Sequence, residues 1–264
     1  MREYIINQAG HVMRYQDLPG KDIPILFIHG LGCAGSFDYP EVAAQDSLKS
    51  HRCILVDLLG AGYSDKPHDF TYTVEDHAEY LMEFIDYLNL GPFILFGHSL
   101  GGAVALSLAD KCRDRLHQII LSESNLDKSA EGSTSKYIAD FDMAEFIDGG
   151  FNALLYDSRE SGNRMWAASL SVWLPKAAYL ISKSAAEGGN PSWRSILYSL
   201  ECPRTFIFGE NSLPDSDMQI LTEHGIQIEI VKQAGHSMAW ENPEGLASAI
   251  KRGILAGRCK HTTI

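Results

Sequence analysis

The sequence predicts an α/β protein with a doubly wound, mostly parallel sheet. Three observations lead to this prediction. Short apolar runs recur along the 264 residues and are typical of strands that are buried on both faces. Amphipathic stretches with helical spacing lie between these runs. One long stretch, residues 126–200, has no convincing strand and predicts a helical insertion.

The strand pattern begins with two short segments, 3–7 and 11–16, joined at Ala9 and Gly10. The next segment, IPILFIH at 23–29, is apolar throughout, as expected for a strand covered on both faces. The remaining predicted strands are 52–57, 92–97, 116–123, 203–210 and 226–233.

The clearest helical pattern covers residues 73–90. Thr73 and Asp76 have the spacing of a capping box, which predicts the start of the helix. The apolar positions that would share one face are Val74, Ala78, Leu81, Met82, Ile85 and Leu88. Helices are also predicted over 103–112 and 242–255, so strands and helices alternate along the chain.

The insertion divides the chain into a core of residues 1–125 and 201–264 and a helical cap of residues 126–200. The cap is rich in aromatic residues, namely Phe141, Phe146, Tyr156, Trp166, Trp173, Tyr179 and Trp193. They suit a pocket for a fairly apolar substrate of small to medium size, although tryptophans in helices more often serve packing. Trp166 and Trp173 are seven residues apart and could share one helix face.

Composition and charge narrow the possible partners. The net charge of −12 argues against binding to nucleic acid or to an anionic membrane. The N-terminal residues contain neither a signal peptide nor a membrane anchor, so we expect a cytoplasmic protein without membrane insertion. The five cysteines, Cys33, Cys53, Cys112, Cys202 and Cys259, have no disulfide or metal-ligand spacing. The sequence makes no prediction of oligomeric state.

A candidate nucleophile lies in GHSLGG at 97–102. Ser99 is at the centre of a G-x-S-x-G motif, between a predicted buried strand and a predicted helix, which is the context this motif requires. The glycines allow a sharp turn without side-chain collisions. The backbone N–H of Leu100 would then be free to stabilise negative charge at the start of the helix. The alternative is a tight turn with an inert serine.

A serine hydroxyl needs a base that accepts its proton. His236 lies in AGHSMAWENPE, after the last predicted strand and before the last predicted helix, at the end of the sheet where Ser99 should emerge. His98 is inside the turn and is expected to point away, and His29 ends a strand. The other histidines weighed, His11, His51, His117, His224 and His261, lie in surface-like contexts. We therefore predict His236 as the general base, against a structural loop histidine.

An acyl-transfer site also needs donors for an oxyanion. HGLG at 29–32 follows a buried strand, and its glycines let the backbone approach the reacting centre. The N–H groups of Leu31 and Leu100 would form the oxyanion hole. A glycine turn at a strand end is the alternative, and the presence of GHSLGG in the same chain makes it less favoured.

Four motifs, HGLG, DLLGAGYS at 57–64, GHSLGG and GHSMAWENP, occur in the order and spacing of the α/β-hydrolase superfamily, which this chain resembles outside the insertion. The resemblance implies an eight-stranded, mostly parallel sheet, a Ser–acid–His triad and a cap between the sixth and seventh strands. Leu59 departs from the arginine that many members have, which we expect to affect local structure more than chemistry.

The triad acid departs from the pattern of many relatives, which place an aspartate three residues after the glycine that ends the seventh strand. That position is Ser212 here, and serine cannot hold an imidazolium by charge. The competing carboxylates are Glu210, Asp215 and Asp217 in the same loop and Glu123 at the end of the sixth strand. Some branches of the superfamily place the acid after the sixth strand, so we predict Glu123, with Asp215 next and a structural salt bridge or cap as the alternative role of Glu123.

These residues together predict a serine hydrolase that cleaves a carboxylic ester, thioester or amide through an acyl-enzyme on Ser99, without metal or organic cofactor. A serine nucleophile argues against dehalogenase and epoxide hydrolase chemistry, which needs a carboxylate there. Two alternatives stay open. One is a C–C bond hydrolase or lyase that uses the same triad, and the other is a non-catalytic ligand receptor on the same fold.

Overall fold

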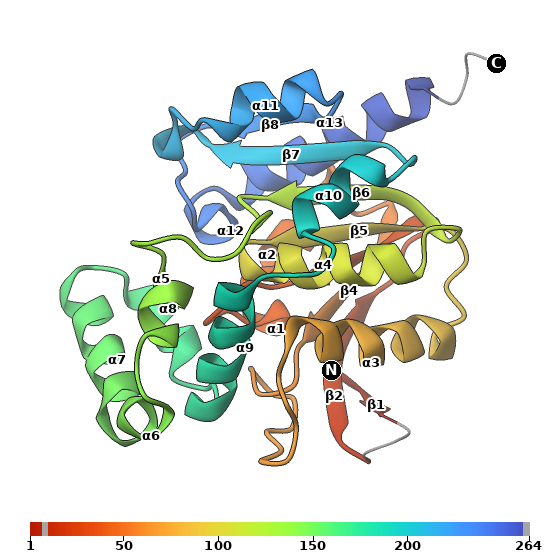
Figure 1. Cartoon of the computed structure of the whole chain (residues 1–264). Coiled ribbons are helices and arrows are strands. Elements are labelled where there is room, and N and C mark those ends of the chain that lie inside the picture. The colour runs from red at the N-terminus through yellow and green to blue at the C-terminus, as the bar shows by residue number, and fades with distance from the viewer. Residues whose placement is uncertain (7–9, 261–264) are drawn as a thin grey trace.

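The computed structural model describes the backbone of residues 1–6 and 10–260 and the side chains up to residue 257. Eight strands in this part of the chain form one sheet in the order β1-β2-β4-β3-β5-β6-β7-β8 (Figure 1). The strands are β1 (Arg2–Ile5), β2 (Val12–Leu18), β3 (Asp22–Ile28), β4 (His51–Asp57), β5 (Phe93–His98), β6 (Leu116–Ser122), β7 (Arg204–Gly209) and β8 (Gln227–Val231). All eight predicted strands are confirmed, although residue 7 and Ala9 of the first turn lie outside the described residues.

The sheet is antiparallel at one edge and parallel elsewhere. Strand β2 pairs antiparallel with β1 and with β4, and every other pairing is parallel. The carboxyl ends of β3, β5, β6 and β7 therefore meet at one edge of the sheet. In an open α/β sheet, this edge is where ligands bind.

The helices connect the strands and cover both faces of the sheet. They are α1 (Gly35–Asp38), α2 (Pro40–Ala43), α3 (Val74–Tyr87), α4 (Leu100–Lys111), α5 (Thr134–Ala139), α6 (Met143–Glu145), α7 (Phe151–Glu160), α8 (Arg164–Leu170), α9 (Pro175–Glu187), α10 (Trp193–Ser199), α11 (Asp217–Glu223), α12 (Met238–Glu241) and α13 (Pro243–Lys260). A π-helical turn, η1 (Phe146–Gly150), joins α6 to α7, and a 3-10 turn, η2 (Glu210–Ser212), follows β7.

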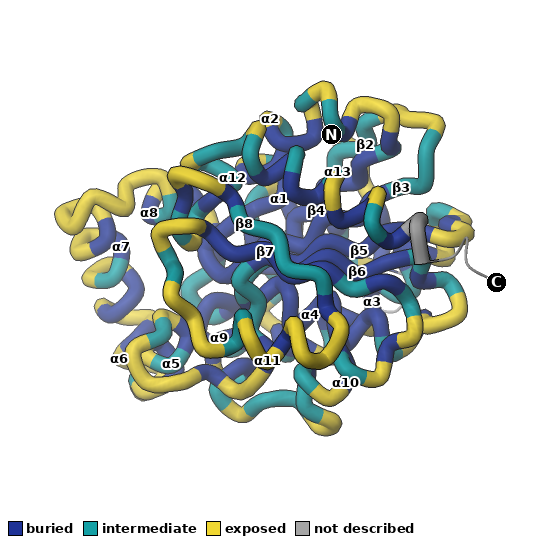
Figure 2. Tube along the Cα trace, turned by 90° about the horizontal axis from the view of Figure 1, so that it is seen from above, coloured by how far each residue is buried: buried dark blue, intermediate teal, exposed yellow. Residues whose placement is uncertain are grey.

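The sheet separates two hydrophobic cores, because successive side chains of a strand point to opposite faces. On β3, Leu26 and Ile28 belong to the core under α3 and α4, whereas Ile25 and Phe27 belong to the core under α2 and α13. All four are fully buried. The sheet accordingly forms the buried centre of the molecule (Figure 2).

Helix α3 illustrates how the sequence specifies a covering helix. It begins after Thr73, whose hydroxyl accepts a hydrogen bond from the backbone N–H of Asp76 at 3.1 Å, as the capping spacing predicts. Leu81 and Ile85 from the predicted apolar face are fully buried in the core. Burial of each such side chain stabilises the fold by about 1.5–3 kcal/mol, so this face fixes the helix on the sheet.

The segment between β6 and β7 is helical throughout the residues that form regular structure, from α5 to α10. Helices α5–α9 gather beyond the end of the sheet to which the arrow of β7 points (Figure 1). Helix α10 instead packs on α4, where the indole N–H of Trp193 lies 3.2 Å from the hydroxyl of Ser107. The boundaries of the cap at 126 and 200 stay a prediction.

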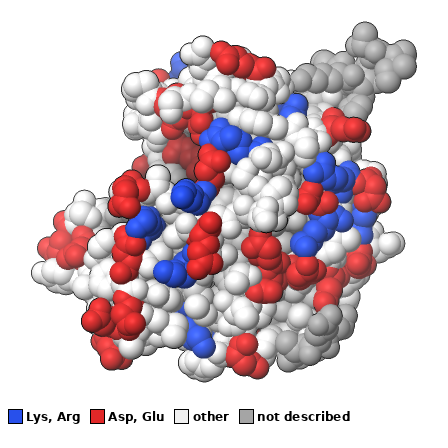
Figure 3. Space-filling model, viewed as in Figure 1, with Lys and Arg blue, Asp and Glu red and all other residues white. Residues whose placement is uncertain are grey.

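Charged side chains of both signs share the visible face, and the described cysteines are unpaired. On the face shown in Figure 3, basic side chains are scattered among acidic ones. The four cysteines with described side chains, Cys33, Cys53, Cys112 and Cys202, are free thiols. Within the described residues, no helix combines the length and the apolar character needed to cross a membrane.

Candidate active site

Ser99 occupies a strained turn between β5 and α4. Its φ of 51° and ψ of −128° are unusual for a residue with a side chain. Its backbone N–H donates to the carbonyl of Ser122 at 2.9 Å, which ties the turn to β6. A Cβ on Gly101 would lie 2.1 Å from the carbonyl oxygen of His29, so the close approach of the two loops requires glycine there.

A continuous series of hydrogen bonds joins the three predicted triad residues. The Nε2 of His236 lies 3.0 Å from the Oγ of Ser99, and its Nδ1 lies 2.8 Å from the Oε2 of Glu123. The imidazole of His236 is 54% exposed, whereas the side chain of Glu123 is only 11% exposed. The geometry suits a base that takes a proton from Ser99 while a carboxylate holds its other nitrogen.

The hydrogen bonds around Glu123 favour the ionised form of its carboxyl group. It follows β6 with a φ of 40°, a second strained position beside the site. Burial alone would raise the pKa of its carboxyl, but hydrogen bonds from His236, Ser212 and the backbone N–H of Gly209 outweigh burial and lower the pKa. The Gly209 N–H donates to Oε1 at 2.9 Å. Ser212, the position of the absent aspartate, thus contacts the carboxylate predicted to replace it.

The competing carboxylates have other partners. Glu210 accepts from the backbone N–H of Gln233 at 3.0 Å, and Asp215 accepts from the backbone N–H of Asp217 at 2.7 Å. Asp217 forms an ion pair with Arg194 at 2.8 Å. Among the described residues, none of these three carboxylates contacts His236 within hydrogen-bond distance.

The histidines near the site have structural partners. The Nδ1 of His98 lies 3.0 Å from the carbonyl of Ser122, and burial together with the nearby His236 lowers the pKa of His98 to about 3. His29 is fully buried between two loops, with Nδ1 at 2.9 Å from the carbonyl of Gly30 and Nε2 accepting from the N–H of Leu58 at 3.0 Å. Burial lowers its pKa. Both rings are therefore neutral.

The expectation of a surface-like context for the remaining histidines is wrong for His51. This residue begins the inner strand β4, and its ring is buried with Nδ1 at 2.8 Å from the carbonyl of Ile23. His224 is exposed, and His11 and His117 are half-buried. His261 lies outside the described residues.

The loop that carries Leu31 is held by the DLLGAGYS segment. The carboxylate of Asp57 accepts from the backbone N–H and the hydroxyl of Ser36, at 2.8 and 2.7 Å, and from the N–H of Tyr63 at 2.9 Å. These hydrogen bonds connect the start of α1 to the end of strand β4. The loop that precedes α1 is thereby fixed in front of Ser99.

Two tryptophans of the insertion also hold this loop. The indole N–H of Trp166 donates to the carbonyl of Leu31 and that of Trp173 donates to the carbonyl of Cys33, both at 2.8 Å. The Trp166 ring packs so closely that a Cβ on Gly32 would lie 2.5 Å from it, and Gly32 has a φ of 74°. The seven-residue spacing suggested that Trp166 and Trp173 could share one helix face, but α8 ends at Leu170 and Trp173 lies after it.

A pocket of about 430 Å³ opens in front of Ser99. Leu31, Leu100 and His236 line it with Ser99, as an oxyanion hole at these positions requires. Leu100 is the first residue of α4, so its N–H is one of those that no turn of the helix satisfies. The other wall comes from the insertion and contains many side chains with hydroxyl or amide groups.

The expected aromatic pocket is not found. Of the seven aromatic residues named above for the insertion, only Trp166 lines the pocket. Phe146, Trp173, Tyr179 and Trp193 are buried in the hydrophobic core, and Tyr156 is 64% exposed. The helices of the insertion bury their large apolar side chains against each other and against the core, which is the usual use of an amphipathic face.

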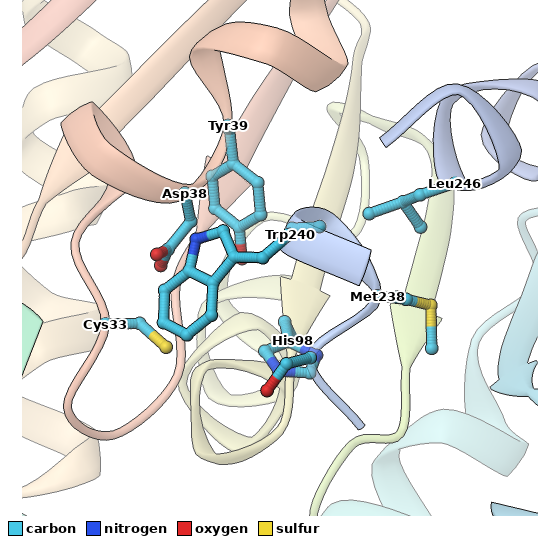
Figure 4. Close-up of a pocket in the computed structure, with 9 residues that line it drawn as sticks. Cys33, Asp38, Tyr39, His98, Met238, Trp240 and Leu246 are labelled. Carbon is cyan, nitrogen blue, oxygen red and sulfur yellow. The ribbon is translucent and has the colours of Figure 1, made fainter. Parts of the chain in front are cut away.

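A second, small cavity of about 20 Å³ lies beside His98, between α1 and α12 (Figure 4). The carboxyl of Asp38 and the indole nitrogen of Trp240 point toward one another in it. The Oδ2 of Asp38 accepts from the N–H of Ala34 at 3.0 Å, whereas its Oδ1 and the Tyr39 hydroxyl have no partner among the described residues. Burial raises the pKa of Asp38 to about 8. No sequence motif indicated this residue.

The described residues contain no group of three or more histidine, cysteine, aspartate or glutamate side chains that could hold a metal ion.

Comparison with known proteins identifies the family of this chain. Residues 23–177, more than half of the chain, match the family model described as alpha/beta hydrolase fold. The chain belongs to the α/β-hydrolase fold family. Among curated relatives of this hydrolase-fold protein, haloalkane dehalogenase 2 of Mycobacterium tuberculosis is 34% identical over 107 residues, which are 40% of this chain and 36% of that protein. The match thus spans about a third of the dehalogenase.

Two further comparisons cover nearly the whole α/β-hydrolase chain. Carboxylesterase YbfK of Bacillus subtilis is 27% identical over 249 residues, 90% of this chain and 82% of that protein. The structure of an esterase from Exiguobacterium antarcticum superimposes with a TM-score of 0.79 at 17% identity, over 97% of this chain and 100% of that one. At this identity the structural likeness shows the fold alone.

Proposed function

We propose that this protein is a serine carboxylesterase that hydrolyses small-molecule esters. The observation on which the proposal rests is the hydrogen-bonded series from Ser99 through His236 to Glu123, with Oγ–Nε2 and Nδ1–Oε2 distances of 3.0 and 2.8 Å. The series faces a pocket of about 430 Å³, a volume typical of small-molecule sites. The whole-length similarity to a carboxylesterase supports an ester as the substrate.

In the acylation step, the Oγ of Ser99 attacks the ester carbonyl while the Nε2 of His236 takes the hydroxyl proton. Glu123 accepts a hydrogen bond from the Nδ1–H of the resulting imidazolium and stabilises its charge. The N–H groups of Leu31 and Leu100 stabilise the oxyanion. The carbon–oxygen bond to the leaving group then breaks, and His236 gives its proton to the departing alcohol.

In the deacylation step, a water molecule attacks the acyl-enzyme. His236 takes one proton from this water, and the second tetrahedral oxyanion forms beside the same N–H groups. The bond to Oγ breaks, the proton on His236 returns to Ser99, and the carboxylic acid leaves. Every proton is thus transferred by this chain's own residues, and the mechanism requires neither metal nor organic cofactor.

The proposal does not include the chemistry of haloalkane dehalogenase 2, which matches only part of this chain. Displacement of a halide needs a carboxylate nucleophile that forms an alkyl ester, whereas the residue at the turn is Ser99. An acyl transfer, in which a hydroxyl attacks a carbonyl, is the chemistry that this residue type supports.

Hydrolysis of p-nitrophenyl acetate tests the proposal. We expect burst kinetics or steady turnover in the wild type and loss of activity by about 10⁴-fold or more in Ser99→Ala. Ser171→Ala is the matched control, because the hydroxyl of Ser171 donates only to the carbonyl of Ala168 on the surface of the insertion. Equal activity in Ser99→Ala and in the wild type would contradict the proposal.

A further inference from the structure

The pocket in front of Ser99 has an uncommon wall. Ligand pockets are usually lined by apolar and aromatic side chains with a few polar groups. Here the wall contributed by the insertion and by the loop after β6 contains seven residues that carry hydroxyl or amide groups: Asn125, Ser133, Thr134, Ser135, Ser158, Ser161 and Asn163. The substrate that fits this wall differs from the apolar one expected from the sequence.

Several of these polar groups are available to a ligand. Asn163 precedes α8, but its side chain makes no capping hydrogen bond. Asn125 has a half-buried side chain, and neither its amide nor the hydroxyls of Thr134 and Ser158 hydrogen-bond to other described residues. Ser135 and Ser161, in contrast, already have partners, Ser129 at 2.7 Å and the carbonyl of Ser158 at 3.2 Å.

The pocket also lacks charge among the described residues that line it, apart from the titratable His236. A second hollow of about 350 Å³ continues from it past Ser133 and Thr134 and includes Lys136. The Nζ of Lys136 is already paired with Asp140 at 2.5 Å and with Glu131 at 3.3 Å. A charged substrate group in the pocket would therefore lose hydration without gaining a free counter-charge.

The exposure of His236 indicates which part of the ester occupies the pocket. The leaving alcohol receives its proton from this side chain, which is 54% exposed, so we assign the alcohol to the open side of His236 and the acyl group to the pocket. The acyl group stays beside the oxyanion donors. Asn125, whose backbone N–H donates to the carbonyl of Ser99 at 3.1 Å, is next to the nucleophile, and Asn163 lines the same pocket from the insertion.

We propose that the acyl group of the substrate is uncharged and carries a hydrogen-bonding group such as an amide or hydroxyl, for which Asn125 and Asn163 are the specificity-determining residues. This inference rests on the proposed esterase function. An asparagine side chain both donates and accepts hydrogen bonds, so the pair recognises neutral polar groups of either kind. An apolar acyl chain would leave both amides unpaired when it excludes water.

A set of matched esters tests the inference. The p-nitrophenyl esters of N-acetyl-β-alanine and of 5-methylhexanoic acid have acyl groups of nearly equal shape, and only the first has an amide. The p-nitrophenyl monoester of adipic acid adds a charged group at similar length. Each kcat/KM is divided by the rate constant of hydroxide-catalysed hydrolysis of the same ester, which removes differences in intrinsic reactivity.

We expect the amide ester to exceed the 5-methylhexanoate by about tenfold or more, because one hydrogen bond left unmade in a buried site has an effect of this size. The adipate monoester should be the poorest of the three. In Asn125→Leu and Asn163→Leu the preference for the amide should fall toward unity or reverse. Asn152→Leu, on the exposed side of α7, is the matched control and should keep the wild-type ratio.

The short substrate p-nitrophenyl acetate separates failure of this inference from failure of the proposed function. If the acetate is hydrolysed but the 5-methylhexanoate is preferred over the amide ester, the inference on the acyl group is wrong and the esterase proposal stands. The same holds if both asparagine variants keep the wild-type ratio. If the acetate is not hydrolysed, the proposed function fails and the inference fails with it.

Discussion

The indole N–H of Trp166 donates a hydrogen bond of 2.8 Å to the backbone carbonyl of Leu31. This contact joins helix α8 of the insertion to the loop whose backbone is proposed to bind the oxyanion. Trp173 makes the equivalent contact with the carbonyl of Cys33, two residues further along the loop. The insertion thus limits the rotation of two peptide planes next to the proposed oxyanion hole, in addition to lining the pocket.

Replacement of Trp166 by phenylalanine should lower kcat about tenfold with a smaller change in KM. The aromatic ring is retained, but the Leu31 carbonyl loses the indole N–H that donates to it, so the loop can shift the oxyanion donor. A misplaced oxyanion donor lowers kcat by less than the 10²–10³-fold that follows complete removal of the donor. Steady-state kinetics with p-nitrophenyl acetate measures the effect.

Trp193→Phe is the matched control for this variant. Its indole N–H also makes one hydrogen bond, to Ser107 of α4 at 3.2 Å rather than to the loop of Leu31, so the kcat of the variant should stay at the wild-type value. A similar loss of kcat in both variants would mean that the effect comes from destabilised packing of the insertion.

Asp38 should make the stability of the protein depend on pH. Burial raises the pKa of its carboxyl to about 8, whereas an aspartate in the unfolded chain has a pKa of about 3.9. Between these values the folded state keeps a proton that the unfolded state has released, so the free energy of unfolding falls as the pH rises from about 4 to about 8. Asp38→Asn removes this titration, so its stabilising effect should be larger at pH 8 than at pH 4 by about 5 kcal/mol, since about four pKa units of about 1.4 kcal/mol each separate the folded and unfolded states.

Thermal unfolding at both pH values measures this difference, since about 1 kcal/mol shifts the Tm of a chain of this size by about 2–4 °C. Asp46→Asn provides the control, because Asp46 is exposed and paired with Lys49. The account of Asp38 is wrong if its variant gives the same change of Tm at pH 4 and pH 8.

Glu123 should be more important for turnover than any carboxylate of the loop after β7. Glu123→Gln removes the charge that stabilises the His236 imidazolium, and loss of this charge typically lowers kcat by about 10³–10⁴-fold. Asp215→Asn should leave kcat unchanged, because Asp215 contacts the backbone of Asp217 instead. Comparison of kcat for the two variants at pH 7 measures both effects. If Asp215→Asn lowered kcat more than Glu123→Gln, the triad acid would lie in the loop after β7 instead.

Much of the fold could be predicted because its local signals agree with its tertiary structure. The buried strands are continuous apolar runs, and the start of α3 follows from the Thr73 cap. The proximity of Ser99 and His236 follows from motifs at the carboxyl ends of parallel strands. These features depend on the spacing of residues along the chain, and this spacing can be read from the sequence alone.

The pocket wall and the loop contacts could not be predicted in the same way. Trp166 and Asn125 meet around Ser99 only because the insertion folds back over the end of the sheet, and no periodicity encodes that approach. For the same reason the aromatic residues of the insertion suggested an apolar pocket, although most of them pack in its interior. The burial of Asp38 and His51 likewise depends on neighbours distant in sequence.

The central claim, that Ser99 is a nucleophile activated by His236, is tested most directly by mass spectrometry after reaction of the folded protein with a fluorophosphonate. The account predicts one added phosphonyl group, mapped to the peptide that contains Ser99, and strongly slowed labelling in His236→Ala. An unlabelled protein, or a label on another serine with Ser99 unmodified, would contradict it.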